Sequence, residues 1–158
     1  MLHKRIYRLA LSAGLLLAGS MALHAQVVRV PLQGSDFPIS QGVWVGDTLY
    51  LSGVPDRLVM KGTPGDTELQ TTHVLDAIQK ELEDQKLGMK DIVMMHAYLV
   101  GDPAKGGKMD FAGFMSAYTK YFGTKDQPNK PARTAMQIAA LGAPGALVEI
   151  EVIAVREK

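Results

Sequence analysis

The stretch IVMMHAYLV, from Ile92 to Val100, decides the fold because it is apolar at nearly every position. A strand with one buried face alternates apolar and polar residues, whereas a strand covered on both faces is apolar on both. The stretch therefore predicts a central strand of a sheet that is covered on two sides.

An amphipathic helix is expected before this strand and another after it. The first has apolar residues at three- and four-residue steps, which are Leu69, Val74, Leu75, Ile78 and Leu82. Thr67 and Gln70 have the spacing of a capping box, so this helix is expected to begin there and to end near Gly88. The second begins near Asp110 and carries one apolar stripe, formed by Phe111, Phe114, Met115, Tyr118 and Phe122.

Five further strands are expected from β-rich runs that are bounded by turn residues. They are Val27–Pro31, the arms Val43–Val45 and Leu49–Leu51 of a hairpin turning at Gly46-Asp47, Thr134–Ala139 and Leu147–Val155. Two helices cannot cover both faces of so apolar a sheet, so the expected class is α+β with both helices on one face. The other face then needs a second copy of the chain, which predicts a homo-oligomer.

The first 25 residues have the layout of a secretory signal peptide, with a basic start (MLHKRIYR), the apolar stretch Leu9–Leu23 and small residues at Ala22 and Ala25. A membrane-anchoring helix is the alternative, but the apolar stretch is shorter than the roughly 18 to 20 residues that span a bilayer. We expect cleavage after Ala25, with Ala22 as a second site. Residues 26–158 would then be one exported domain, periplasmic in a bacterium and without stable membrane association.

Removal of this segment changes the charge of the protein. The chain has 17 basic and 16 acidic residues, and Lys4, Arg5 and Arg8 are three of the basic ones. No acidic residue lies in the first 25, so residues 26–158 carry 14 basic and 16 acidic side chains, a net charge of −2. A mildly acidic domain argues against a nucleic-acid partner. The absence of cysteine excludes disulfides, thiolate metal sites and thiol nucleophiles.

Two patterns that could hold a metal or a phosphate fail in detail. The histidines are His3, His24, His73 and His96. None of them has a second ligand at metal-binding spacing, so no metal or cofactor is predicted. His96 is expected to be a hydrogen-bonded core residue. The glycine-rich run 101–108 has Met109 where a phosphate loop needs Ser or Thr, so it is expected to be a flexible loop.

Charged residues on otherwise apolar strands mark the candidate site. Arg133 shares one side of its strand with Ala135 and Gln137, which leave room beside a guanidinium. Glu149 and Glu151 lie among aliphatic residues of the last strand, and buried carboxylates are costly unless they have a role. Surface or interface ion pairs are the alternative interpretation.

The end of the hairpin adds Ser52 and Gly53, where a hydroxyl and exposed backbone groups could face a ligand. Arg133 and Glu149 each lie near the beginning of a strand. If these strands are antiparallel, the two side chains are separated by about five residues at roughly 3.3 Å each. They would then meet only across a subunit interface, which links the site to the oligomer.

Five segments of the domain resemble the RidA/YjgF family of reactive-intermediate deaminases. They are Pro38-Ile39-Ser40-Gln41, Leu51-Ser52-Gly53, Asp110-Phe111-Ala112, Pro131-Ala132-Arg133 and Val148–Ala154. The resemblance implies a chorismate-mutase-like α+β fold, with a mixed β-sheet and two helices packed on one face, and a homotrimer with clefts between subunits. It also implies hydrolysis of small imines or enamines of the 2-aminoacrylate type to a 2-keto acid and ammonia, without metal or cofactor.

The resemblance also implies roles for single residues. Arg133 would hold the substrate carboxylate bidentately, and Glu149 would orient or activate the attacking water. The aliphatic surroundings of Glu149 are expected to raise its pKa. Ser52 and the backbone near Gly53 and Ala135 would line the pocket.

Three pocket positions depart from the usual family pattern, with Ile39 in place of tyrosine, Met115 in place of asparagine and Ala135 in place of cysteine. The leading hypothesis is therefore a deaminase with an altered substrate-binding set. The alternative is a non-catalytic exported trimer that binds a small carboxylate or an apolar ligand in the same cleft. Ribonuclease activity, also attached to the family, is disfavoured by the acidic domain and by the lack of a paired His/Lys centre.

Overall fold

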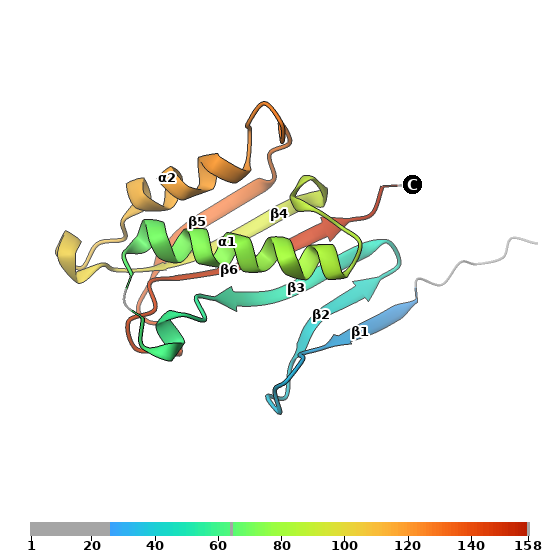
Figure 1. Cartoon of the computed structure of the whole chain (residues 1–158), viewed down its shortest axis with the longest axis horizontal. Coiled ribbons are helices and arrows are strands. Elements are labelled where there is room, and N and C mark those ends of the chain that lie inside the picture. Colours follow the sequence, from blue (N-terminus) through green and yellow to red (C-terminus); the bar gives the residue numbers. More distant parts are fainter. Residues whose placement is uncertain (1–25, 64, 158) are drawn as a thin grey trace, which may run out of the picture.

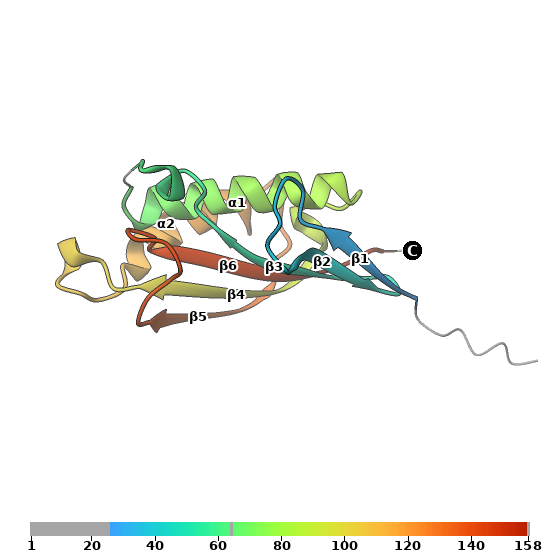
Figure 2. The same cartoon turned by 90° about the horizontal axis from the view of Figure 1, so that it is seen from below.

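The computed structural model describes residues 26–63 and 65–157, so the expected signal peptide at residues 1–25 lies outside the described residues. The described chain forms one six-stranded sheet, and Figure 2 shows both helices on the same side of it. This confirms the expected α+β class with two helices on one face. Within the described part of the chain, no helix has the length and apolar character needed to cross a membrane.

The strand order across the sheet is β1-β2-β3-β6-β4-β5 (Figure 1). Only the β4–β5 pair is parallel, and the other four pairs are antiparallel. The expected strand Val27–Pro31 is confirmed and lies at one edge of the sheet, and the hairpin at Gly46-Asp47 is confirmed as well. The bounds are β1 Val27–Pro31, β2 Ser40–Val45, β3 Thr48–Pro55, β4 Ile92–Val100, β5 Ala132–Ile138 and β6 Val148–Val155.

The two helices are α1 (Thr67–Asp84) and α2 (Phe111–Tyr121), with short 3₁₀ turns at Val59–Lys61, Met89–Asp91 and Pro103–Lys105. Between helices and sheet lies one hydrophobic core, whose fully buried members include Leu49, Leu75, Ile78, Met95, Phe114 and Ile150. Helix α1 ends at Asp84, earlier than the expected end near Gly88.

The beginning of α1 differs from the expected capping box. Asp66 is the N-cap, and its carboxylate accepts a hydrogen bond from the backbone N–H of Leu69 at 2.9 Å. The carboxylate one residue earlier thus satisfies a free N–H of the first turn, which is the role expected of Thr67. The Thr67 hydroxyl is buried instead, with no hydrogen-bond partner among the described residues.

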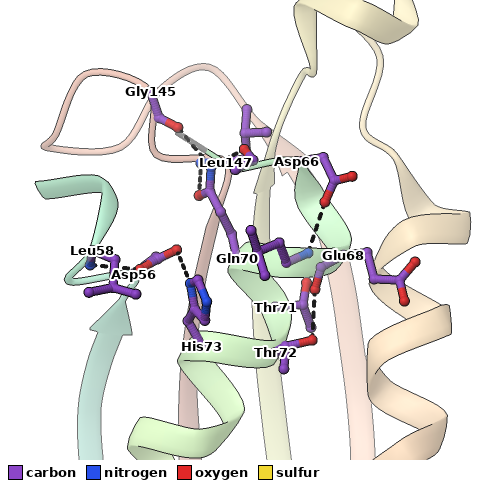
Figure 3. A network of polar contacts seen from close by, with 12 residues as sticks. Asp56, Leu58, Asp66, Glu68, Gln70, Thr71, Thr72, His73, Gly145 and Leu147 are labelled. Atoms are coloured by element: carbon purple, nitrogen blue, oxygen red, sulfur yellow. Dashed lines mark hydrogen bonds and ion pairs between the residues drawn. The ribbon is translucent and has the colours of Figure 1, made fainter. Parts of the chain in front are cut away.

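Gln70, the other member of the expected capping box, joins α1 to the loop before β6 (Figure 3). Its amide nitrogen donates to the carbonyls of Gly65 at 2.8 Å and Gly145 at 2.9 Å, and its amide oxygen accepts from the N–H of Leu147 at 2.8 Å. A completely buried amide with these three bonds fixes the point at which β6 begins.

The end of β3 is fixed to the same helix. His73 Nδ1 lies 2.9 Å from the carboxylate of Asp56, which is buried and also accepts from the N–H of Leu58 (Figure 3). These bonds therefore hold the end of β3 and the beginning of β6 against the first half of α1.

The face of the sheet away from the helices is open in the single chain. On β4, Met95, Ala97 and Leu99 are buried towards the helices, whereas His96 and Tyr98 are half-buried on the open face. β4 is an internal strand, as expected, but it lies next to the edge strand β5, and only one of its faces is covered within one chain.

Candidate functional site

Glu149 lies on the open face of the sheet, directly against Gly53. Two residues of β3, Ser52 and Gly53, oppose one of β6 here, because Leu51 pairs with Val152 and Val54 pairs with Ile150. The resulting β-bulge brings the backbone of Gly53 to the Glu149 side chain. A Cβ atom on Gly53 would lie 3.0 Å from the carboxyl carbon of Glu149 and closer still to one of its oxygens. A side chain at position 53 would therefore displace this carboxylate from its present position.

Ser52 occupies the other position of the bulge, and its hydroxyl has a structural partner. It donates to the backbone carbonyl of Ser40 at 2.7 Å, which joins the end of β3 to the start of β2. Ile39 directly precedes this contact, and its side chain is 50% exposed. The structure thus places Ser52 and Gly53 beside Glu149, with Ile39 at the adjoining strand end.

The electrostatic setting of Glu149 disfavours its charged form. Partial burial raises the pKa of Glu149, and the like charge of Glu151 raises it further. Glu151 itself accepts from the Tyr98 hydroxyl at 2.9 Å and lies 2.8 Å from His96 Nδ1. No hydrogen bond or ion pair from another described residue reaches the Glu149 carboxylate, which leaves it available to a water or ligand.

Arg133 lies on the opposite, helix-covered face, at the edge strand β5. Its guanidinium carbon is 4.4 Å from the ring centre of Tyr118, 5.0 Å from that of Phe114 and 5.7 Å from that of Phe111. One of its N–H groups points to the sulfur of Met115 at 3.1 Å. Aromatic rings therefore position this cation through cation–π contacts.

The charge of Arg133 is not neutralised within the described chain. Its partners among the described residues are aromatic rings and a thioether, and none of the ion pairs among these residues includes it. An arginine that is held by rings keeps its planar fork of donors free for a carboxylate from outside.

Further along the same face of β5 lie Ala135 and Gln137, as expected from the alternation. Gln137 accepts from the N–H of Met109 at 2.9 Å and donates to the carbonyl of Gly107 at 3.0 Å. These bonds tie down the run 101–108, which was expected to be a flexible loop. A further bond from the N–H of Asp102 to the carbonyl of Lys108, at 3.0 Å, closes it at its base.

Arg133 and Glu149 do not meet within one chain, as expected, but the reason differs from the one inferred from the sequence. Their strands are not neighbours, because β4 lies between β5 and β6. Arg133 pairs with Met95, whose side chain is in the core, and Glu149 pairs with Tyr98, whose side chain is on the open face. The two charged residues thus lie on opposite faces of the sheet.

The candidate residues form two half-sites. One half contains Arg133, Met115 and Ala135 at the β5 edge, and the other contains Glu149, Gly53 and Ser52 at the bulge, with Ile39 nearby. Sequence reasoning missed three supporting features. They are the ring contacts of Arg133, the contacts of His96 and Tyr98 with the Glu151 carboxylate, and the three hydrogen bonds of the Gln70 amide. The aromatic stripe of α2 was visible, but only the register of the sheet shows which strand it faces.

A six-stranded mixed sheet with two helices on one face makes this an α+β protein, and its edge strand carries a free arginine. Comparison with known proteins then identifies it: residues 35–156 match the model of the Endoribonuclease L-PSP family, and the chain belongs to this family. This confirms the family-level part of the RidA/YjgF resemblance.

Relatives agree with this assignment over most of their length. The chain is 39% identical over 119 residues to a RutC family protein of Saccharolobus solfataricus and 37% identical over 118 residues to one of Sulfurisphaera tokodaii. These matches cover 74% and 73% of this chain, and 86% of each relative.

Solved structures share the fold. A YjgF family member from Neisseria meningitidis matches with a TM-score of 0.66 at 21% identity, covering 85% of this chain and 98% of the other. A member of the YjgF/YER057c/UK114 family from Mycobacterium tuberculosis matches with a TM-score of 0.64 at 24% identity, covering 83% and 100%. At these identities the likeness concerns the fold alone.

Proposed function

We propose that this protein hydrolyses small 2-imino or enamine carboxylates to 2-keto acids and ammonia, in clefts between the subunits of a homotrimer. The observation that carries the proposal is the pair of half-sites, which supplies an unneutralised arginine and an unpaired carboxylate on opposite faces of one sheet. The acidic balance of residues 26–158 disfavours RNA as the ligand.

The reaction needs an anchor for a carboxylate and a base for one water. Arg133 binds the substrate carboxylate through its fork of N–H donors, which places the imine carbon at a fixed distance from the guanidinium. Glu149 accepts a proton from water while the water oxygen forms a bond to that carbon, and the C=N π electrons move to nitrogen. Glu149 returns this proton to the nitrogen, which gives a tetrahedral amino alcohol. The hydroxyl proton of this intermediate then moves to the nitrogen through Glu149, and the C–N bond breaks as the C=O bond forms, which releases ammonia and the keto acid.

Assembly is part of this proposal because one chain cannot supply both groups to one ligand. The open sheet face carries half-buried side chains that another copy of the chain would cover, which supports an interface there. An interface that joins the bulge of one subunit to the β5 edge of the next would bring Glu149 and Arg133 to the same cleft. Residues 1–25, if they act as a signal peptide, would place this chemistry outside the cytoplasm.

The direct test uses residues 26–158 and an amino-acid oxidase that generates 2-iminopropanoate from alanine. We expect the protein to accelerate the release of ammonia and pyruvate above the spontaneous rate. A rate equal to that in buffer would contradict the proposed hydrolase activity. Carboxylate binding that requires Arg133 would then favour the non-catalytic binding protein.

The shared cleft predicts that two inactive variants restore activity when they are mixed. Arg133→Ala and Glu149→Gln are each expected to be inactive as pure trimers. Unfolded together in equal amounts and refolded, they should recover about a quarter of the wild-type activity, because a random quarter of the clefts receives both intact residues. Refolding each variant alone is the control, and an inactive mixture of folded trimers would contradict the shared cleft.

The neighbouring carboxylates predict a pH effect. Glu149 must be ionised to accept a proton, so activity is lost as the pH falls through its raised pKa. Glu151→Gln removes one cause of that shift, and the acidic limb of kcat/KM should move to lower pH. Glu83→Gln, an exposed glutamate on α1, should leave the profile unchanged. An unmoved acidic limb in Glu151→Gln would show that Glu149 does not set it.

A further inference from the structure

The surface around Arg133 is apolar on the side that a ligand would approach. Phe114 and the ring of Tyr118 are buried and support the guanidinium. Other groups near the cation are Phe111, which is 42% exposed, and the half-buried Met115, and the half-buried Ala135 lies two residues further along the same face of β5. None of these three side chains has a hydrogen-bond donor, and the thioether is only a weak acceptor.

The polar side chain that follows on the same face of β5 is already committed. Both ends of the Gln137 amide are bonded to the backbone of the closed loop, at Met109 and Gly107. A polar substituent that packs against Phe111, Met115 and Ala135 would therefore lose its water without gaining a hydrogen-bond partner from these side chains, which is costly.

Met115 is the central element of this wall. Its sulfur lies 3.1 Å from a guanidinium nitrogen of Arg133, so it flanks any carboxylate bound to that fork. A flexible thioether adapts its shape to an aliphatic group, and the methyl of Ala135 beside it occupies little space. The half-site therefore offers room and apolar contact next to its single charged anchor.

On this basis, and resting on the function proposed above, we propose that the cleft selects imino acids with an apolar side chain of about leucine's size. Met115 is the specificity-determining residue. Ile39, half exposed at the edge of the other half-site, would add a second apolar surface once subunits assemble.

The test compares the imines of leucine and asparagine, whose side chains have nearly the same shape and differ in polarity. We expect kcat/KM for the leucine imine to exceed that for the asparagine imine by about tenfold or more, since an unpaired polar group is rejected by an apolar wall. Met115→Asn should bring this ratio to about one or below, whereas Met115→Leu should retain the preference. Met60→Asn, at an exposed methionine of the 3₁₀ turn Val59–Lys61, should leave the ratio unchanged.

Failure of this inference can be distinguished from failure of the proposed function. If neither imine is hydrolysed faster than in buffer, calorimetric binding of 4-methyl-2-oxopentanoate and 2-oxosuccinamate is compared instead. Tighter binding of the apolar acid, abolished in Met115→Asn, supports the selection without turnover. A ratio of one or below in the wild type, by rate or by binding, overturns it, and so does a ratio that Met115→Asn leaves unchanged.

Discussion

Arg133→Ala should lower kcat/KM for imine hydrolysis by about 30-fold to several thousand-fold, the range that corresponds to truncating one partner of a buried charge pair. The guanidinium is the only described group in its half-site that carries a positive charge, and its aromatic support leaves it free to bind a carboxylate. Arg133→Lys keeps the charge but loses the planar fork, so it should recover only part of the activity. Steady-state kinetics over a range of imine concentrations measure the effect.

Arg156 provides a matched control for this substitution. Its guanidinium lies 4.3 Å from the ring centre of Trp44, almost the same stacking distance as Arg133 has from Tyr118, and it donates to the carbonyl of Gln85. Arg156→Ala should therefore lower the thermal stability and leave kcat/KM nearly unchanged. Equal losses of activity in both variants would show that stacking on a ring, and not carboxylate binding, explains the effect.

Gly53→Ala should reduce kcat about 100-fold, because misplacing a catalytic group by roughly 1 Å has an effect of that size. The added methyl group would collide with the Glu149 carboxylate, which is the far end of a flexible side chain and can rotate away. The backbone of Gly53 does not have a positive φ, so alanine fits its conformation. The melting temperature should therefore stay close to that of the wild type while the base moves out of place.

Gly88→Ala is the control for a glycine without such a neighbour. A Cβ atom there meets nothing within 4 Å, and the residue has an extended backbone with φ of −140°. Stability and kcat should both remain near wild type. Full activity in Gly53→Ala would mean that the position of the Glu149 carboxylate does not matter, and Glu149 would lose its proposed role.

Much of the fold could be predicted from local patterns in the sequence. The three- and four-residue repeat of α1, the aromatic stripe of α2 and the turn at Gly46-Asp47 each depend on neighbours along the chain. The apolar stretch of β4 correctly indicated an internal strand, since it has a partner strand on each side. The start of α1 was predicted wrongly from the local sequence. Asp66 and Thr67 can both cap a helix, and in the structure Asp66 is the N-cap.

The candidate site was predictable in its residues but not in its geometry. Alternation correctly placed Arg133 with Ala135 and Glu149 with Glu151 on shared strand faces. It could not reveal that β4 separates the two strands, because strand order depends on contacts between distant parts of the chain. The β-bulge that sets Gly53 against Glu149 also depends on register, and no local pattern marks it.

The position of β4 between the two charged strands has a consequence for the protein in dilute solution. A lone chain holds Arg133 and Glu149 at separate places, so under the proposed function it has the carboxylate anchor without the base at one place and the base without the anchor at another. Under the proposed function, newly folded subunits are inert until they associate, and turnover per chain falls when the protein is diluted below the concentration at which the trimer dissociates. The sheet would then make catalytic output depend on abundance more steeply than in simple proportion.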